Sequence, residues 1–247
     1  MTRFHIRPEA VEGDRVTFDA EETRHLARVL RLRSGSLVQT VDGRGHELTV
    51  RLTRISARTA EGDVVGRAER PTESPLPLTL AQAMPKGDKF EGIIRMATEL
   101  GVGHVIPLES ERTITRVDAA QTPHRLARWR RVAKEAAKQS GRGVIPEIRG
   151  PIALDHWLTE PRSPGLLLCV WEDERVPLAA VLPGHPPPHA TVVVGPEGGL
   201  SLEEVTRLRA AGAVVASLGP RILRTETAGP VALALLQSRY GDLGNER

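Results

Sequence analysis

The stretch that decides the fold is Thr191-Val-Val-Val-Gly-Pro-Glu-Gly-Gly-Leu-Ser-Leu-Glu-Glu204. Its first residues form a short apolar run, which is typical of a strand buried in a parallel sheet. A glycine-rich turn follows, and Ser201 with Glu204 has the spacing of a capping box, which begins a helix that we expect to run to Gly212. This order predicts an α/β sheet with a loop at the carboxyl end of a strand, where such sheets bind ligands.

The chain from Leu78 onward repeats this alternation of strand and helix. Apolar runs predict further strands, and helical periodicity predicts further helices. The expected strands are 78–83, 105–108, 166–171 and 214–218, and the expected helices are 88–101, 123–139 and 228–240. We therefore predict an α/β domain with a mostly parallel sheet.

The first 70 residues have a different pattern, which predicts a small β-rich unit. Residues 46–53 alternate between apolar and polar side chains, as in a half-buried strand, and residues 21–32 have helical spacing. Three prolines between Pro71 and Pro77 predict an extended linker. We therefore expect one domain over residues 1–70, a linker over 71–77 and a second domain over 78–247.

Composition limits the class of protein. Hydrophobic residues make up 40% and charged residues 26% of the chain, as in ordinary globular proteins. No apolar run approaches the roughly 20 residues that span a bilayer, and the first residues do not read as a signal peptide. Cys169 is the only cysteine, and the eight histidines show no ligand spacing with a carboxylate. We expect a cytoplasmic protein without membrane or metal, and this excludes a metal-dependent hydrolase.

The segment 125–149 is strongly basic. It contains eight Arg or Lys residues and only two Glu residues. A stripe of this kind suits a polyanion, because each neutralised phosphate releases counterions. Most charge runs are nevertheless solvated helix faces. From the residues alone, a nucleic-acid surface and a solvated helix face both remain open.

Two loops carry the candidate chemistry. The loop at 195–201 has neither the Gly-Lys-Ser/Thr of a P-loop nor a Gly-x-Gly-x-x-Gly pattern. Because Glu197 would repel a triphosphate, a neutral or cationic adenosine ligand fits this loop better, and a tight turn without ligand is the alternative. The loop at 217–228 places two arginines, a glutamate and two threonines directly before an apolar helix. Polar groups beside a core helix need partners, and helix capping explains only one or two of them.

Both loops resemble known motifs. Val194-Gly-Pro-Glu-Gly-Gly-Leu-Ser201 and Leu218-Gly-Pro-Arg-Ile-Leu-Arg-Thr-Glu-Thr-Ala228 are similar to the cofactor-binding motifs of SPOUT methyltransferases, and most closely to the RsmE family of 16S ribosomal RNA (uracil-N3)-methyltransferases. Further matches occur in the same order at Arg3-Phe4, 25–31, 86–102 and 135–142. Met96 departs from the pattern, because a basic residue is expected there.

The resemblance implies a PUA-like β-barrel domain that binds RNA, followed by a SPOUT domain whose mostly parallel sheet is tied in a trefoil knot. It implies S-adenosyl-L-methionine as cofactor, and N3 of a specific uridine in 16S ribosomal RNA of the small ribosomal subunit as the methyl acceptor. It also implies a homodimer and a role in ribosome biogenesis.

The resemblance and the residue chemistry together nominate site residues. Arg224 or Arg3 would stabilise negative charge on the base, and Glu226 would act as base or orienting group. The expected cofactor residues are Val170, Trp171, Val194, Gly195, Pro196, Glu197, Gly199, Leu218, Gly219, Ile222, Leu223, Thr225 and Ala228. The expected RNA-binding residues are Arg28, Arg31, Lys86, Arg128, Arg131, Lys138, Gln139, Ser140 and Arg142.

Two alternatives remain open within RNA-directed functions. One is a ribose 2′-O-methyltransferase of the same superfamily, although such enzymes usually carry an Asn/Ser-rich motif where this chain has Arg224-Thr-Glu-Thr227. The other is a non-catalytic RNA-binding assembly protein that keeps the PUA-like module. The intact glycines Gly198 and Gly199 argue against it, and a measurement of S-adenosylmethionine binding distinguishes the two classes.

Overall fold

The chain divides into two units, which the computed structural model describes over residues 3–42, 45–69, 73–115, 118, 120–162 and 164–244. The first unit comprises Met1–Glu73 together with Ala137–Ile145, and the second comprises Ser74–Ala136 and Pro146–Arg247. The end of the expected linker packs on the second unit, because Leu76 is only 2% exposed and the carbonyl of Pro77 accepts a hydrogen bond from the Ala190 N–H at 3.0 Å. The grouping of 137–145 with the first unit was not predicted, because helical periodicity does not reveal which neighbour a helix end contacts.

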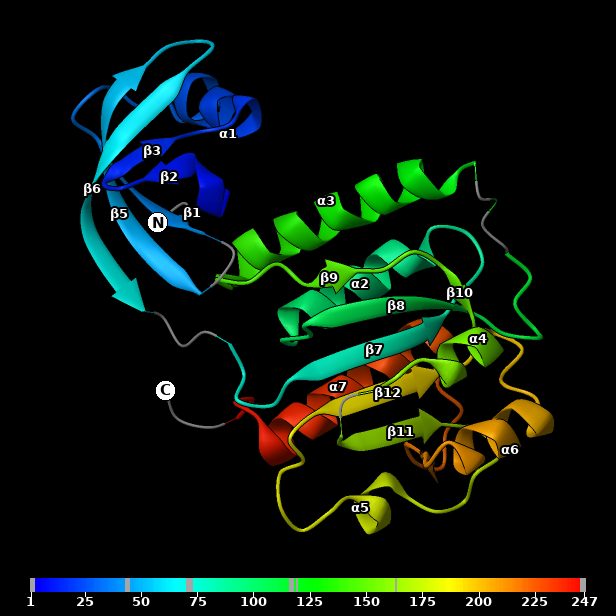
Figure 1. Ribbon diagram of the computed structural model, residues 1–247. Helices are drawn as coiled ribbons and strands as arrows, with labels where there is room; N and C mark the ends of the chain where they lie inside the picture. The colour runs from blue at the N-terminus through cyan, green and yellow to red at the C-terminus, as the bar shows by residue number, and fades with distance from the viewer. Residues whose placement is uncertain are drawn as a thin grey trace. The chain divides into compact units, whose positions relative to one another are not determined.

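A parallel sheet of seven strands forms the centre of the second unit (Figure 1). Its order is β10-β8-β7-β12-β11-β13, with β9 paired to β8, and every pairing is parallel. This confirms the predicted sheet. The strands are β7 (Leu78–Ala83), β8 (His104–Glu109), β9 (Glu147–Ile148), β10 (Ile152–Ala153), β11 (Leu166–Val170), β12 (Ala190–Val194) and β13 (Val214–Ala216).

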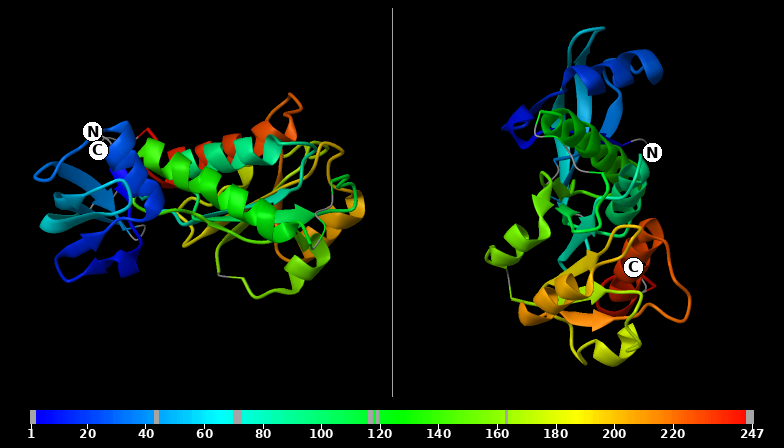
Figure 2. Two further views of the ribbon diagram at one scale, coloured as in Figure 1. Left: turned by 90° about the horizontal axis from the view of Figure 1, so that it is seen from above. Right: turned by 90° about the vertical axis from the view of Figure 1, so that its right-hand side faces the viewer.

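Helices cover both faces of this sheet. They are α2 (Lys89–Glu99), α3 (Thr122–Ser140), α4 (Leu154–Thr159), α5 (Leu178–Val181), α6 (Leu202–Ala210) and α7 (Thr225–Tyr240). Because strand side chains alternate between faces, Ala81 and Cys169 pack with α4 and α6, whereas Leu80 meets Gly229 of α7. In the right-hand view of Figure 2, α6 in orange and α7 in red lie on opposite sides of the strands. Burial on both faces explains why the strands are continuous apolar runs.

The start of α7 corrects the prediction. The helix begins at Thr225, three residues before the expected Ala228. The carbonyl of Arg224, whose backbone is extended, accepts the N–H groups of Thr227 and Ala228 at 2.8 and 2.9 Å. The polar residues Thr225 and Glu226 therefore form the first turn of this helix, where a carboxylate interacts favourably with the helix dipole.

The first unit is built on a six-stranded sheet with the order β1-β4-β5-β6-β3-β2. Its elements are β1 (Arg3–His5), η1 (Pro8–Ala10), β2 (Val11–Glu12), β3 (Arg15–Thr17), α1 (Ala20–Arg24), η2 (His25–Val29), β4 (Leu37–Val41), β5 (His46–Ile55) and β6 (Ala60–Glu69). All pairings are antiparallel except β1 with β4. The predicted alternation holds for Leu48, Val50 and Leu52 of β5, which are buried in the core beside Phe4, but Glu47, expected on the solvent face, is buried as well.

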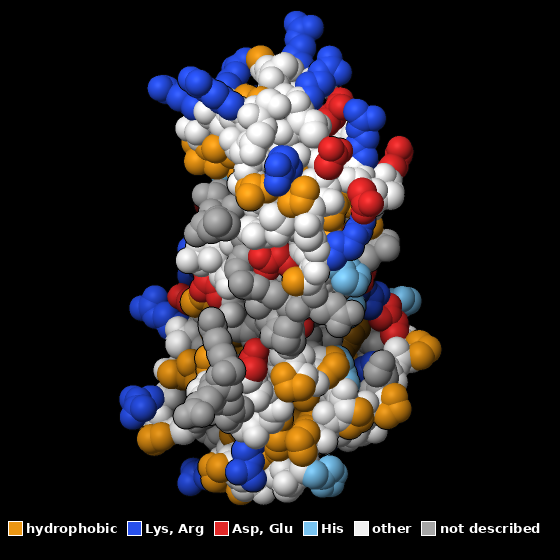
Figure 3. All heavy atoms as spheres, turned by 90° about the vertical axis from the view of Figure 1, so that its left-hand side faces the viewer, with side chains coloured by type: hydrophobic (Ala, Val, Ile, Leu, Met, Phe, Trp, Pro, Cys, Tyr) orange, Lys and Arg blue, Asp and Glu red, His pale blue; other side chains and the backbone are white. Residues whose placement is uncertain are grey.

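The predicted helix over 21–32 is shorter and less regular than expected. It continues beyond α1 as one π-helical segment, η2, and Arg31 then takes a left-handed conformation with φ 51°. Left-handed backbone is uncommon for a residue other than glycine, and π-helical turns often occur at functional sites. Arginine and lysine side chains gather at one end of this unit in Figure 3. Among its described side chains, the exposed arginines are Arg7, Arg15, Arg24, Arg28, Arg31, Arg33, Arg51, Arg54, Arg58 and Arg67.

Among the described helices, none is long and apolar enough to cross a membrane.

Candidate functional site

A cavity of about 340 Å³ opens at the carboxyl ends of β11, β12 and β13 in the second unit. The two loops that the sequence singled out form most of its wall. The lining residues are Lys89, Val170, Trp171, Glu172, Val194, Gly195, Pro196, Glu197, Gly199, Ser217, Leu218, Gly219, Pro220, Arg221, Ile222, Leu223, Arg224, Thr225, Glu226 and Ala228. This is the edge of an open α/β sheet at which ligands bind.

The first loop folds back tightly after β12. A Cβ added to Gly195 would lie 2.9 Å from the backbone nitrogen of Leu200 and 3.0 Å from the carbonyl carbon of Gly199. Gly199 has φ +69°, and its N–H donates to the carbonyl of Pro196 at 2.9 Å. Glycine is required at the first position for space and at the second for conformation. The predicted capping box then begins α6, with the Ser201 N–H 2.9 Å from the Glu204 carboxylate and the Glu204 N–H 3.2 Å from Ser201 Oγ.

The second loop follows β13 and ends at α7. Ser217 Oγ accepts the Gly219 N–H at 3.2 Å and donates to the Gly219 carbonyl at 3.0 Å, which closes the turn. At the far end of the loop, Thr225 Oγ1 donates to the carbonyl of Gly195 at 2.6 Å. This bond joins residues 30 positions apart and fixes the two loops to each other.

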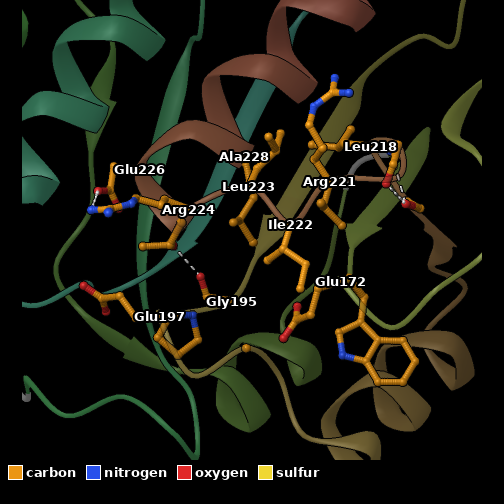
Figure 4. Close-up of a pocket in the computed structure, with 18 of the residues that line it drawn as sticks. Glu172, Gly195, Glu197, Leu218, Arg221, Ile222, Leu223, Arg224, Glu226 and Ala228 are labelled. Atoms are coloured by element: carbon orange, nitrogen blue, oxygen red, sulfur yellow. Dashed lines mark hydrogen bonds and ion pairs between the residues drawn. The ribbon is translucent and has the colours of Figure 1, made fainter.

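The end of β11 supplies the third side of the cavity. Trp171 Nε1 donates to the carbonyl of Leu200 at 3.3 Å, which ties this strand end to the first loop. The Glu172 carboxylate fills the space beside Gly199, where an added Cβ would lie 1.7 Å from its Oε1. Figure 4 shows Glu172 extending toward Ile222 in the centre of the view, whereas Arg221 extends away from both.

A charged network borders the cavity on the side of α2. Lys89 Nζ lies 3.0 Å from Glu197 Oε1 and 3.5 Å from Glu226 Oε2, so it bridges carboxylates of both loops. The backbone N–H of Lys86 also donates to Glu197, at 3.1 Å. Burial acts to raise the pKa of Glu197, but the hydrogen bonds from Lys89 and the backbone outweigh it and lower that pKa. The hydrogen bond to Glu197 chiefly raises the pKa of Lys89, so both groups are ionised at neutral pH.

The chemistry of the wall suits an adenosine ligand without phosphates. Three carboxylates and three basic side chains line the cavity, so it offers no excess of positive charge to a triphosphate. Aliphatic side chains of Val170, Leu218, Ile222 and Leu223 provide the apolar surface that a nucleobase needs. The structure brings together every residue that the sequence nominated for the cofactor.

The nominated catalytic residues lie partly in this cavity. Arg224 and Glu226 both line it, and Figure 4 shows the Arg224 side chain extending toward Glu226. Their closest approach is 4.0 Å, with the Arg224 side chain 81% exposed and that of Glu226 25% exposed. Arg224 is thus held loosely and is accessible to a substrate. Arg3 belongs to β1 of the first unit, and its side chain lies outside the described part of the chain.

The nominated RNA-binding residues separate into two groups. Most are exposed, although Arg128 also forms an ion pair with Glu91 at 2.6 Å. Lys138 and Arg142 instead serve the first unit: Lys138 pairs with the buried Glu22, and Arg142 is 4% exposed with its Nε 3.1 Å from Glu73 Oε2. The exposed group consists of Arg28, Arg31, Lys86, Arg128, Arg131, Gln139 and Ser140.

Several cavity residues were missed by the sequence reasoning. Lys89, Glu172 and Arg221 line the cavity, yet none was nominated. A signal existed for each of them. Lys89 stands in the matched stretch Lys86-Gly-Asp-Lys89, Glu172 directly follows the nominated Trp171, and Arg221 lies inside the second loop.

The thiol of Cys169 is buried in the second unit. Burial raises the pKa of the Cys169 thiol to about 12, so it is not a nucleophile. Within the described residues, no group of three or more His, Cys, Asp or Glu side chains is arranged to hold a metal ion.

Comparison with known proteins identifies the family. An RNA methyltransferase domain matches residues 72–237, and an RNA methyltransferase PUA domain matches residues 18–65. The ribosomal RNA small subunit methyltransferase E of Synechocystis is 36% identical over 96% of this chain and 77% of that protein, and the one of Bacillus subtilis is 31% identical over 96% of each. The crystal structure of the Neisseria gonorrhoeae enzyme, bound to S-adenosyl methionine, has a TM-score of 0.89 at 33% identity and covers 98% of this chain and 99% of that one. The chain therefore belongs to the ribosomal RNA small subunit methyltransferase E family.

Proposed function

We propose that this protein methylates 16S ribosomal RNA of the small ribosomal subunit at N3 of one uridine, with S-adenosylmethionine as methyl donor. One observation carries the proposal: the cavity at the carboxyl ends of β11, β12 and β13 is formed by the two loops whose motifs match the family. A full-length structural relative has S-adenosyl methionine bound. The cavity offers carboxylates, apolar side chains and no excess positive charge, which suits a cationic adenosine cofactor.

The two loops would hold this cofactor and orient it. When bound, S-adenosylmethionine supplies a methyl group that is attached to a positively charged sulfur, and transfer of the methyl group leaves this sulfur as a neutral thioether, which is a good leaving group. Gly195 and Gly199 let the backbone approach the ligand, and Leu218, Ile222 and Leu223 would pack against its base. Alignment of the methyl group with an incoming nitrogen can supply several kcal/mol of the barrier.

Glu226 and Arg224 would act on the acceptor base. A neutral uracil N3 still carries its proton and is a poor nucleophile. Glu226 would take that proton while the N3 lone pair forms the new N–C bond, and Arg224 would stabilise the negative charge that develops on the base. Lys89 lies 3.5 Å from Glu226 Oε2 and would hold its carboxylate in place.

The substrate uridine must be unpaired or flipped out when it reacts. In a base-paired uracil, N3 is occupied by the pairing hydrogen bond, so the cavity can act only on a base outside a duplex. We further propose the trefoil knot and the homodimer that the family resemblance implies. The contacts of α7 with β7, β12 and α2 after β13 support the former, whereas the homodimer rests on the family resemblance alone.

RNA contact is assigned to the exposed residues among those nominated from the sequence, which include Arg28 and Arg31 of the first unit but not Arg207. The variant in which Arg28 and Arg31 are both replaced by alanine should bind 16S RNA fragments more weakly, because phosphate contacts supply most of the affinity. A plot of the logarithm of the RNA association constant against the logarithm of the salt concentration has a negative slope. The magnitude of this slope should decrease by about 0.7 for each lost single-strand phosphate contact. Fluorescence anisotropy over a salt series measures this slope, with Arg207→Ala on α6 as control, because Arg207 pairs with Asp155 at 2.8 Å. If the slope is unchanged, neither Arg28 nor Arg31 contacts an RNA phosphate.

Mass spectrometry of 16S RNA tests the main proposal. RNA from cells that lack the gene should lose one N3-methyluridine, and expression of the wild-type chain should restore it. If the nucleoside profile of the deletion strain is unchanged, the proposal is wrong. The appearance or loss of a 2′-O-methylated nucleotide instead would favour the ribose-methylating alternative. Calorimetry with S-adenosylmethionine separates the enzyme from a non-catalytic assembly protein, which would not bind it.

A further inference from the structure

A glutamine is the penultimate residue of the central strand β7, between the apolar residues Ala81 and Ala83. Gln82 is fully buried, with 0% of its surface exposed. It pairs in register with Val194, the last residue of β12. Because strand side chains alternate, Gln82 lies with Leu80 on the sheet face that α7 covers. Gln82 does not line the cavity, but it lies directly behind the place where both cofactor loops begin or end.

The side-chain amide of Gln82 contacts both loops. Its Nε2 lies 2.9 Å from Thr225 Oγ1 and 3.4 Å from the carbonyl oxygen of Gly195. The Thr225 hydroxyl itself donates to that same carbonyl at 2.6 Å. One buried triangle of hydrogen bonds therefore joins β7, the first loop and the first residue of α7. These groups are 113 and 143 positions from Gln82 in the sequence.

The orientation of this amide is determined by its surroundings. Nε2 faces the carbonyl oxygens of Ala83, at 3.1 Å, and of Gly195, both of which only accept hydrogen bonds. A flipped amide would place oxygen against oxygen. The Oε1 atom therefore faces Gly229 of α7, where an added Cβ would lie 3.0 Å away, and it has no hydrogen-bond partner among the described residues. A buried polar atom without a partner is costly, and an apolar side chain here would avoid that cost.

We propose that Gln82 is a positioning residue that fixes the spacing of the two cofactor loops through its donors. This inference rests on the proposed function. Gln82 acts through the carbonyl of Gly195 and the hydroxyl of Thr225, and both residues line the cavity. A binding site holds its ligand accurately only when a supporting layer of residues locks the contacting groups. Loss of the donors separates the loops, which weakens cofactor binding and misaligns the methyl group.

Two substitutions at Gln82 and one matched control test the inference. Gln82→Leu keeps much of the volume and removes the donors, and Gln82→Glu keeps the shape but directs an acceptor at the Gly195 carbonyl. The control is Gln237→Leu, because Gln237 is also buried, at 1% exposure, and donates to the Leu100 carbonyl at 2.8 Å, far along α7 from the cavity. Calorimetry with S-adenosylmethionine should give a Kd raised about tenfold for Gln82→Leu and more for Gln82→Glu, from the loss of positioning. Gln237→Leu should lower Tm while its Kd stays within about twofold of wild type.

The same link can be broken without changing Gln82. Thr225→Val removes the hydroxyl that bridges Gln82 and Gly195, whereas Thr225→Ser keeps it, so only the valine variant should lose cofactor affinity. In the Gln82→Leu, Thr225→Val double variant, the loss of cofactor affinity should be no larger than in whichever single variant binds S-adenosylmethionine less tightly, because both substitutions break the same link. The inference is overturned if Gln82→Leu and Thr225→Val bind S-adenosylmethionine as tightly as the wild type. If the wild-type chain itself binds none, the proposed function fails first.

Discussion

Replacement of Glu226 by glutamine should lower kcat by about a hundredfold or more while the Kd for S-adenosylmethionine stays nearly unchanged, since general base catalysis contributes at least that much. Glutamine preserves the shape of the side chain and its place beside Lys89, but it cannot accept the N3 proton. The variant should regain activity as the pH is raised, because hydroxide then removes that proton from the substrate. Single-turnover methylation of a 16S RNA fragment across a pH series measures both effects.

Arg224 provides the complementary test. Its exposed side chain is 4.0 Å from Glu226 at the closest approach, so it contributes little to the fold. Arg224→Ala should lower kcat by about a hundredfold, as for the loss of one donor that stabilises transition-state charge. No pH should restore it, because the missing group is a cation and not a base. Glu203→Gln and Arg207→Ala on α6 are the matched controls, and both should keep wild-type turnover. If Glu226→Gln and Arg224→Ala both keep near-full turnover with cofactor binding intact, neither residue has the catalytic role proposed for it.

The elements with local signals were predictable from sequence. The apolar run before Gly195, and the capping box of Ser201 and Glu204, lie within a few residues of the structures they form, so the strand, turn and helix were predicted correctly. The start of α7 was placed too late because apolar periodicity begins at Ala228. Its first turn carries the polar residues Thr225 and Glu226, which both line the cavity and therefore break the apolar pattern.

Contacts between distant segments could not be predicted. The residues that line the cofactor cavity could be nominated because each belongs to a short motif at the end of a strand, and both of these signals can be recognised in a local stretch of sequence. Lys89 acts in that cavity only because α2 places it between Glu197 and Glu226, more than 100 positions away in the chain. Likewise, Arg142 belongs to a basic run, but its guanidinium donates a hydrogen bond to the carboxylate of Glu73, which is 69 positions away in the sequence. A charge pattern therefore does not distinguish a phosphate contact from a buried ion pair.

Gly195→Ala should reduce the affinity for S-adenosylmethionine by about a hundredfold and lower the free energy of unfolding by about 1–3 kcal/mol, the usual cost of overpacking. The added Cβ would lie 2.9 Å from the Leu200 nitrogen and 3.0 Å from the Gly199 carbonyl carbon. These are backbone atoms, so the turn must open and cannot relax by rotation of a side chain. Opening also displaces the Gly195 carbonyl, which accepts the Thr225 hydroxyl at 2.6 Å, and so separates the two loops. Calorimetry gives the affinity, and urea unfolding gives the stability.

Gly92→Ala is the control that separates the site from a general effect of the substitution. Gly92 lies in α2, and an added Cβ there would meet nothing within 4 Å. Alanine favours the helix by about 0.5–1 kcal/mol over glycine, so this variant should be slightly more stable and should bind the cofactor normally. If Gly195→Ala matched Gly92→Ala in affinity, the first loop could widen without loss of its ligand. The tight fold of the turn after β12 would then be a packing requirement only, and the ligand-binding role would rest on the second loop.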